Sequence, residues 1–113
     1  YVEIQGGVKI GNYSKILSYV FIPEGVIIAG DVFIGPGTIF CNDRYPQANN
    51  PGWYLEGVIV DRGAAIGAGC VILPGSRIGA NSLVGAGSLV SGDIPEGMIC
   101  YGRPAKPVRK RHY

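Results

Sequence analysis

Histidine is nearly missing from this sequence, because His112 is the one imidazole among 113 residues. A catalytic zinc site of the carbonic anhydrase type needs three imidazole ligands, which one histidine does not supply. Cysteine is also scarce, and the three cysteines lack paired spacing, so they describe neither a disulfide framework nor a zinc site. We therefore expect no metal, and we expect Cys70 to be a core residue.

Excess charge and long apolar runs are absent as well. The formal net charge is +2, and the basic surplus lies in the last residues, so there is no general argument for nucleic-acid binding. No apolar run approaches the ~18 residues of a membrane span, and no charged segment followed by an apolar core opens the chain. A soluble, cytoplasmic protein without a nucleic-acid partner or a membrane span is the expectation.

Glycine, in contrast, is abundant and periodic. Read in sixes from Val60 to Pro95, the sequence is VDRGAA, IGAGCV, ILPGSR, IGANSL, VGAGSL and VSGDIP. The first place of every hexad is β-branched: Val60, Ile66, Ile72, Ile78, Val84 and Val90. The fourth place holds residue types that tolerate a positive φ: Gly63, Gly69, Gly75, Asn81, Gly87 and Asp93. The fifth place is mostly small enough to point inward: Ala64, Cys70, Ser76, Ser82 and Ser88.

A period of six excludes an amphipathic helix, because it fits neither a 3.6-residue turn nor a glycine-poor helix interior. It is the sequence mark of a parallel β-helix, in which short strands alternate with corners. We therefore predict an all-β fold and a single domain over residues 1–113. We also expect Gly69→Val to damage folding more than Gly67→Ala, because only the first puts a β-branched residue at a positive φ.

The same period opens the chain in a different phase. Its first places are Ile4, Ile10, Ile16, Ile22, Ile28, Ile34 and Phe40, and its fourth places include Gly7, Gly25, Asp31 and Gly37. Tyr13 and Tyr19 break the rule at the fourth place, so we expect those corners to be less regular or displaced. Together the two arrays predict about four coils.

An insertion separates the two arrays, because the phase changes between Phe40 and Val60. Residues 41–57 are rich in turn formers and aromatic residues, and loops of this length in a compact domain are usually functional or disordered. We predict a protruding loop over about residues 41–57, which docks on something through Trp53, Tyr54 and Leu55. We expect a last strand over residues 98–101 and an extended, basic C-terminal tail over about residues 102–113.

The hexads, the insertion and the segment Gly102-Arg103-Pro104-Ala105 together resemble the hexapeptide-repeat acyltransferases, over essentially the whole chain. This resemblance implies a left-handed parallel β-helix, a hand that runs against the usual preference of parallel crossovers and that periodicity alone does not give. The loop sequence Asn42-Asp43-Arg44-Tyr45-Pro46 looks like the Asn-Asp-x-Tyr-Pro loop of the nucleotide-linked amino-sugar N-acetyltransferases.

The resemblance implies a transferase that moves an acetyl group from acetyl-CoA to the amino group of a nucleotide-linked amino sugar, a precursor of cell-surface polysaccharide. It also implies a homotrimer with three active sites, each in a cleft between neighbouring subunits. Two alternatives remain open. One is an O-acetyltransferase acting on a sugar hydroxyl with Asp43 or another carboxylate as base, and the other is a non-catalytic β-helix assembly module.

The shortage of histidine favours an amine over a hydroxyl as the acceptor. An alcohol must lose its proton during attack, and oxygen-acylating relatives place a histidine there as general base. An amine is partly neutral near pH 7, and the departing thiolate, whose thiol pKa is ~8.5, can finally accept the proton. Positioning and backbone donors could then suffice, although a carboxylate can also serve as base.

Five loop residues are candidates for the acceptor side of a site. We expect Asp43 to accept a hydrogen bond from the acceptor amine or to act as a weak base, and Asn42 to orient the amine, although both could merely form a turn. Arg44 could pair with a phosphate or carboxylate of the substrate or stay solvated. Tyr45 and Trp53 could stack on a base or sugar or anchor the loop.

Seven further residues are candidates for the acetyl-CoA side, through the same resemblance. Backbone N–H groups of two glycine-rich segments could hold the pantetheine arm: Gly67, Ala68, Gly85 and Ala86. Basic side chains of the tail could bind the phosphates of coenzyme A: Arg103, Lys106 and Arg109. The alternative is a frayed basic terminus that binds no ligand.

Overall fold

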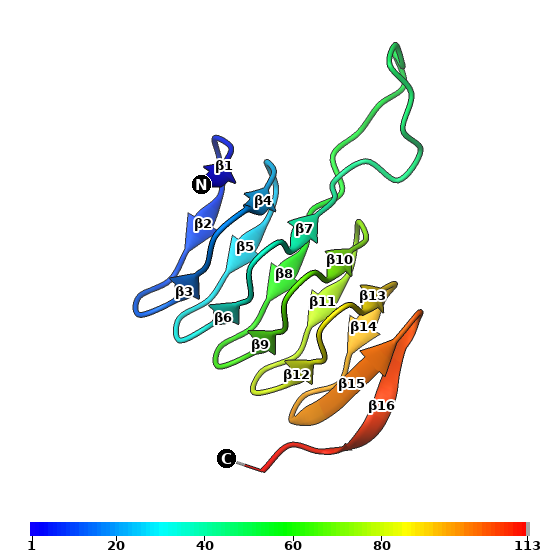
Figure 1. Cartoon of the computed structure of the whole chain (residues 1–113). Coiled ribbons are helices and arrows are strands. Elements are labelled where there is room, and N and C mark those ends of the chain that lie inside the picture. Colours follow the sequence, from blue (N-terminus) through cyan, green and yellow to red (C-terminus); the bar gives the residue numbers. More distant parts are fainter. Residues whose placement is uncertain (113) are drawn as a thin grey trace.

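Three parallel sheets wind around a common axis in the computed structural model, which describes residues 1–112 (Figure 1). Sheet A contains β1 (Val2–Ile4), β4 (Val20–Ile22), β7 (Ile39–Phe40), β10 (Val71–Ile72) and β13 (Leu89–Val90). Sheet B contains β2 (Lys9–Ile10), β5 (Ile27–Ile28), β8 (Ile59–Val60), β11 (Arg77–Ile78) and β14 (Asp93–Ile94). Sheet C contains β3 (Lys15–Ile16), β6 (Phe33–Ile34), β9 (Ala65–Ile66), β12 (Leu83–Val84), β15 (Met98–Gly102) and β16 (Ala105–Lys110).

The chain visits sheets A, B and C in turn, so that three hexads make one coil of a left-handed parallel β-helix. This confirms the predicted fold class. Sheets A and B have five strands each, so the solenoid has five coils where the hexads predicted about four. The fifth coil was missed because β14 and β15 continue the winding after the regular glycine pattern has ended.

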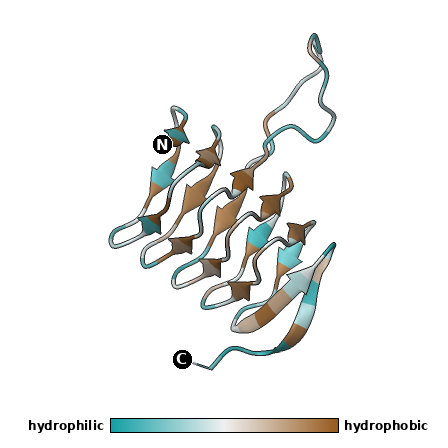
Figure 2. Ribbon diagram, viewed as in Figure 1, coloured by the Kyte–Doolittle hydropathy of each residue, from teal (hydrophilic) through white to brown (hydrophobic). Residues whose placement is uncertain are grey.

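Branched side chains from successive coils stack inside the solenoid, as predicted for the first places. In sheet B the stacked residues are buried from the second coil onward: Ile28, Val60, Ile78 and Ile94. The small fifth-place residues lie beside them, and their polar atoms are satisfied; Ser82 Oγ, for example, donates to the carbonyl of Gly79 at 2.7 Å. Figure 2 shows that most strands are apolar. Ile4 and Ile10 in the first coil stay partly exposed, because no coil covers them.

The corners between strands follow the fourth places. We call them AB, BC and CA after the sheets that they join. The predicted positive φ is found at Gly63, Gly69, Gly75, Asn81 and Gly87. Asp93 was wrongly assigned to a corner: it lies in β14, and Gly92 takes the positive φ one residue earlier. Glycine adopts a positive φ without a side-chain clash, whereas aspartate would be strained there, so the corner falls at Gly92 and not at Asp93.

The corners at Tyr13 and Tyr19 are regular, contrary to the expectation that they would be displaced. Both residues adopt a φ of 63°, which is uncommon for residues other than glycine. Their side chains are exposed, so the rings extend into solvent while the backbone keeps the shape of the corner. The repeat therefore constrains the backbone even where the residue does not favour it.

Two segments depart from the simple solenoid. Residues 41–57 leave it between β7 and β8 and project from corner AB as the predicted loop (Figure 1). The C-terminal tail is not a free extension, because β16 turns back and pairs antiparallel with β15 at the edge of sheet C. No helix that could span a membrane occurs among residues 1–112.

Candidate functional site

The neck of the loop is held to the coils on both sides of it. Asn42 Nδ2 donates to the carbonyl of Glu24 in the preceding coil at 2.9 Å, and the Glu56 N–H donates to the carbonyl of Asn42 at 3.2 Å across the neck. Gly75 in the following coil donates its N–H to Gly57 O at 2.9 Å. The side-chain nitrogen of Asn42 thus has a structural use, whereas its Oδ1 stays available for a ligand.

Arg44 and Glu56 pair across the same neck. Arg44 Nε and Nη2 donate to the two carboxylate oxygens of Glu56 at 2.8 and 2.9 Å, and Nη2 also donates to the carbonyl of Pro74 at 3.1 Å. The hydrogen bonds and charge of Arg44 lower the pKa of Glu56 below its ordinary value. Arg44 was a candidate for substrate binding, and the structure places its guanidinium in the pair with Glu56.

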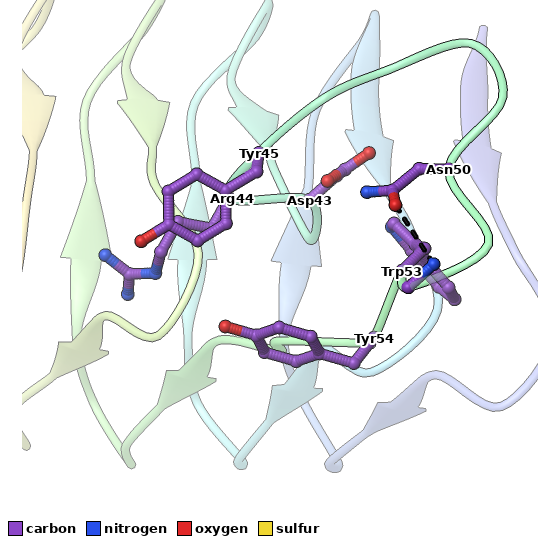
Figure 3. A pocket seen from close by; sticks show the side chains of 7 residues that line it. Asp43, Arg44, Tyr45, Asn50, Trp53 and Tyr54 are labelled. Atoms are coloured by element: carbon purple, nitrogen blue, oxygen red, sulfur yellow. Dashed lines mark hydrogen bonds between the residues drawn. The ribbon is translucent and has the colours of Figure 1, made fainter.

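The upper part of the loop folds around a small pocket of about 40 Å³. It is lined by Asp43, Arg44, Tyr45, Asn50, Gly52, Trp53 and Tyr54. Four of the five candidate acceptor-side residues therefore come together here. Figure 3 shows that Tyr45 and Tyr54 extend in the same direction from the two arms of the loop. Asn50 Oδ1 accepts a hydrogen bond from the Gly52 N–H at 3.0 Å, which stabilises the turn at the tip.

A larger groove of about 570 Å³ runs from the base of the loop along corner AB of the next coils. It is lined by Cys41, Asp43, Arg44, Pro46, Leu73, Pro74, Gly75, Ser91 and Gly92. Asp43 borders both cavities, and its carboxylate makes no hydrogen bond or ion pair within the described part of the chain. It is thus the acidic group that a ligand in the groove would meet.

Cys41 lines the groove together with Asp43, and its thiol is a conventional nucleophile. Partial burial raises the pKa of Cys41 above its ordinary value. The group therefore stays a protonated thiol at neutral pH, and it is the thiolate that acts as a nucleophile. An acyl-cysteine intermediate at this position is not favoured.

The candidate backbone donors for acetyl-CoA lie at corner CA, along the opposite border of sheet A. Of the four proposed backbone donors, Gly67 and Gly85 already donate their N–H groups to Val84 O and Cys100 O, both at 2.8 Å. Those hydrogen bonds join successive coils, so these two N–H groups are already in use, and a contact of the two glycines with coenzyme A stays a prediction. Ala68 and Ala86 are exposed, and their N–H groups have no partner among the described residues, so these two remain candidates.

Arg103 also reaches corner CA. It lies in the turn between β15 and β16, and its Nη1 donates to the carbonyl of Gly87 at 3.1 Å. Lys106 pairs with Tyr101 at the same end of the hairpin, whereas Arg109 pairs with Ile99 toward corner BC. The structure therefore brings Arg103 beside Ala86 and separates Arg109 from both by most of the length of β16.

The two halves of the candidate site do not meet within one chain. The loop and the groove lie at corner AB, and Ala68, Ala86 and Arg103 lie at corner CA. Sheet A runs between these corners and presents apolar side chains on its outer surface: Phe21, Ile39, Val71 and Leu89. A substrate that contacts both corners needs a second copy or a long path around sheet A.

Glu56 and Asn50 were not predicted as parts of the loop structure. Tyr54 was expected to help the loop dock, and it lines the small pocket, where the charge of Glu56 is the main cause of its raised pKa. Glu56 carried no signal in the sequence, because a single carboxylate at the end of a loop does not identify its partner. The pairing with Arg44 is visible only once the two arms of the loop are placed side by side.

Comparison with protein families supports the repeat assignment. Residues 57–92 match the family model "Bacterial transferase hexapeptide (six repeats)". A putative acetyltransferase of Schizosaccharomyces pombe is 37% identical over 89 residues, which cover 75% of this chain and 43% of that protein. Galactoside O-acetyltransferase of Lactococcus lactis is 34% identical over the same length and with the same coverage. The chain thus spans less than half of the length of these curated relatives.

Solved structures with the same fold include a maltose O-acetyltransferase of Clostridium difficile as well as an N-acetyltransferase. A hexapeptide-repeat acetyltransferase of Vibrio cholerae in complex with acetyl-CoA superposes with a TM-score of 0.81 at 28% identity, over 96% of this chain and 63% of that one. A variant of perosamine N-acetyltransferase of Caulobacter crescentus, in complex with CoA and GDP-perosamine, gives 0.78 at 26% identity, over 95% of this chain and 44% of that one.

Proposed function

From the premise that this chain has the repeats and the fold of the hexapeptide-repeat acyltransferase family, we propose that it transfers an acetyl group from acetyl-CoA to the amino group of a nucleotide-linked amino sugar. Such a reaction would supply a precursor of cell-surface polysaccharide in the cytoplasm. The resemblance of the loop to amino-sugar N-acetyltransferases and the similarity to a structure that binds GDP-perosamine support this acceptor class.

The observation that carries the proposal is the free carboxylate of Asp43 at the border of the groove. A carboxylate without a partner attracts a protonated amine and accepts a hydrogen bond from the neutral one. Neither cavity at corner AB is lined by a histidine. An amine acceptor suits this arrangement, because it requires less help from a base than an alcohol does.

The chemistry follows from that arrangement. The lone pair of the acceptor nitrogen attacks the thioester carbonyl, the carbon–sulfur bond breaks, and the proton lost by nitrogen goes finally to the coenzyme A thiolate. Asp43 orients the amine and stabilises the positive charge that develops on nitrogen. Asn42 Oδ1 can accept a second hydrogen bond from the amine, while Tyr45 and Trp53 provide ring faces for a sugar or base.

The acetyl-CoA side is assigned to corner CA. Ala68 and Ala86 are exposed residues whose N–H groups can donate to the amide carbonyls of the pantetheine arm, and they lie in successive coils of the solenoid. Arg103, and Lys106 near the same turn, can bind phosphates. Arg109 would contact coenzyme A only if the nucleotide extended along β16.

A homotrimer would bring the two corners together. In our proposal, corner AB of one subunit faces corner CA of its neighbour, so that Asp43 and Ala86 come from different chains. The apolar outer surface of sheet A supports association, because burial of such side chains is favourable. Three equivalent sites result from this cyclic arrangement.

The test is a screen of acceptors with acetyl-CoA in which free thiol is measured. We expect thiol release with nucleotide-linked amino sugars and much slower release with the same compounds bearing a hydroxyl in place of the amine. Release with hydroxyl acceptors alone would replace the proposal by O-acetylation. No release with either class, and no effect of coenzyme A on melting temperature, would favour a non-catalytic assembly module.

O-acetylation of a sugar is the second candidate, because a relative of this chain is a galactoside O-acetyltransferase. In that reaction Asp43 would act as the general base that removes the hydroxyl proton. Its carboxylate has the access that this role requires.

A further inference from the structure

Asp43 is held from both sides although its own side chain is free. The residue before it, Asn42, is bonded to Glu24 in the preceding coil, and the residue after it, Arg44, is bonded to Pro74 in the following coil. The position of the Asp43 carboxylate therefore depends on how firmly these neighbours are fixed.

The Arg44–Glu56 pair fits closely against corner AB. A Cβ built on Gly75 would lie 2.9 Å from Arg44 Nη2 and 3.0 Å from Glu56 Oε2, so the pair occupies the space that a side chain would need. Two parallel hydrogen bonds and a planar guanidinium give this contact a defined geometry. The pair thus joins the two arms of the loop and ties them to the next coil.

The charges of the groove argue against a phosphate at Arg44. Two charged residues line the groove, and the guanidinium of Arg44 is already shared between Glu56 and a carbonyl, while the carboxylate of Asp43 is unpaired. A phosphate there would reach only the Nη1 edge of a guanidinium whose charge is already balanced by Glu56, and it would lie near two carboxylates. A protonated amine would be attracted by the unpaired carboxylate of Asp43, while the charge of Arg44 is offset by Glu56.

We propose that Arg44 and Glu56 are positioning residues that clamp the neck of the loop and fix Asp43 at the groove, and that Arg44 does not bind the phosphates of the acceptor. This inference rests on the proposed acetyl transfer. It assigns the groove to the amine-bearing end of the acceptor and places the nucleotide outside the groove.

A double-mutant cycle of Arg44→Ala and Glu56→Gln tests the clamp. If the two side chains act only through each other, each single variant should lower kcat by about 10- to 100-fold, since small misplacements of reacting groups have effects of that size. The double variant should be no worse than either single one. A Glu56→Gln variant with full activity beside an impaired Arg44→Ala would overturn the proposal.

The acceptor provides a second discrimination. The activity of Arg44→Ala is compared on a nucleoside-diphosphate-linked amino sugar and on the same amino sugar without the nucleotide. If Arg44 only positions Asp43, the substitution should lower kcat by the same factor for both acceptors. A loss confined to the phosphate-bearing acceptor, and expressed in KM, would show that Arg44 binds phosphate.

Hydrogen exchange separates failure of the clamp from failure of the proposed function. In Arg44→Ala and Glu56→Gln the amides of Glu56 and Gly75, which are hydrogen-bonded at the neck, should exchange faster than in the unmodified protein. Arg77→Ala is the matched control, because it removes a bidentate pair with Asp61 on sheet B. If the variants exchange faster but the unmodified protein transfers no acetyl group to any acceptor, the clamp is supported and the proposed function is refuted. If exchange in the variants is unchanged, the clamp is refuted.

Discussion

At the scale of the residue, two glycines of one hexad differ in what they tolerate. A Cβ on Gly67 would lie 2.6 Å from the backbone nitrogen of Ala86, whereas a Cβ on Gly69 would meet nothing within 4 Å. Gly69 has a φ of +68°, so a side chain there is strained but not obstructed. Close approach of two coils thus restricts Gly67 more severely than backbone conformation restricts Gly69.

We therefore expect Gly67→Ala to be more destabilising than Gly69→Ala. The first requires a shift of packed backbone, which typically costs about 1–3 kcal/mol or more, and the second places alanine at a positive φ, at about 1–2 kcal/mol. Urea unfolding of both variants measures the difference. The expectation from the corner positions concerned Gly69→Val and did not include the close approach of two coils at Gly67. A Gly67→Ala variant more stable than Gly69→Ala would contradict the present prediction.

The role of Asp43 can be tested by a single substitution. Asp43→Asn should keep a measurable rate on an amine acceptor, because orientation and charge stabilisation are lost but no obligatory base is removed. We expect the KM for acetyl-CoA to stay unchanged, since Asp43 lies at corner AB. Steady-state kinetics provide the measurement, and a loss beyond ~10⁴-fold with normal binding of both substrates would identify Asp43 as an essential base.

The sequence was informative about residues wherever the hexad sets the environment. The buried first and fifth places and most positive-φ corners could be read from residue type, because the repeat fixes which side chains point inward. The hydrogen bond that the Gly67 N–H donates to Val84 O could not be predicted, since it depends on the distance to the next coil. Tyr13 and Tyr19 show the same limit, because their positive φ is set by the surrounding coils and could not be predicted from the residue type.

At the scale of the element, the loop was predictable as a boundary but not as a structure. The change of phase located the departure from the solenoid, and the aromatic residues indicated that the loop has an interior. The pairing of Arg44 with Glu56 was not predictable, because residues at the two ends of an insertion approach each other only when the solenoid fixes its ends. The strand β16 was missed for a similar reason, since its apolar residues follow no hexad.

Trp53 is the single tryptophan of the sequence and lines the small pocket, so its fluorescence reports the loop. The hydrogen bonds and charge of Arg44 lower the pKa of Glu56 below its ordinary value in the folded protein. A carboxylate with a lowered folded pKa stabilises the fold above its unfolded pKa, and this contribution is lost as the pH falls through the lower, folded value. We therefore expect a fluorescence transition in an acid titration, at a pH below the ordinary pKa of a glutamate, as the neck of the loop is released.

Two variants show which carboxylate causes this transition. Glu56→Gln should abolish it, because no carboxylate is left to be protonated at the neck. Asp43→Asn should preserve it, which separates Glu56 from Asp43, the carboxylate that lines the pocket of Trp53. A transition that persists in Glu56→Gln and disappears in Asp43→Asn would mean that Trp53 senses Asp43 directly.

At the scale of the whole molecule, the position of the site follows from the triangular winding. The insertion leaves at corner AB, and the exposed alanines and Arg103 lie at corner CA, so the residues proposed for the acceptor and those proposed for the cofactor lie on opposite borders of sheet A. The sequence could single out each group as candidates, because each depends on a local motif. It could not predict their separation, which depends on the number of residues per coil and on where the loop is inserted.

Mixed oligomers test whether neighbouring subunits share the site. Asp43→Lys should repel a cationic acceptor and Arg103→Glu should repel coenzyme A, so each variant alone should be nearly inactive at low substrate concentration. In a trimer whose sites combine the loop of one subunit with corner CA of the next, every mixed trimer contains one site with both original residues. Co-expressed and doubly tag-purified mixed trimers should therefore recover about one third of the unmodified rate. Activity no higher than that of the two parent variants would place both halves of the site in one chain.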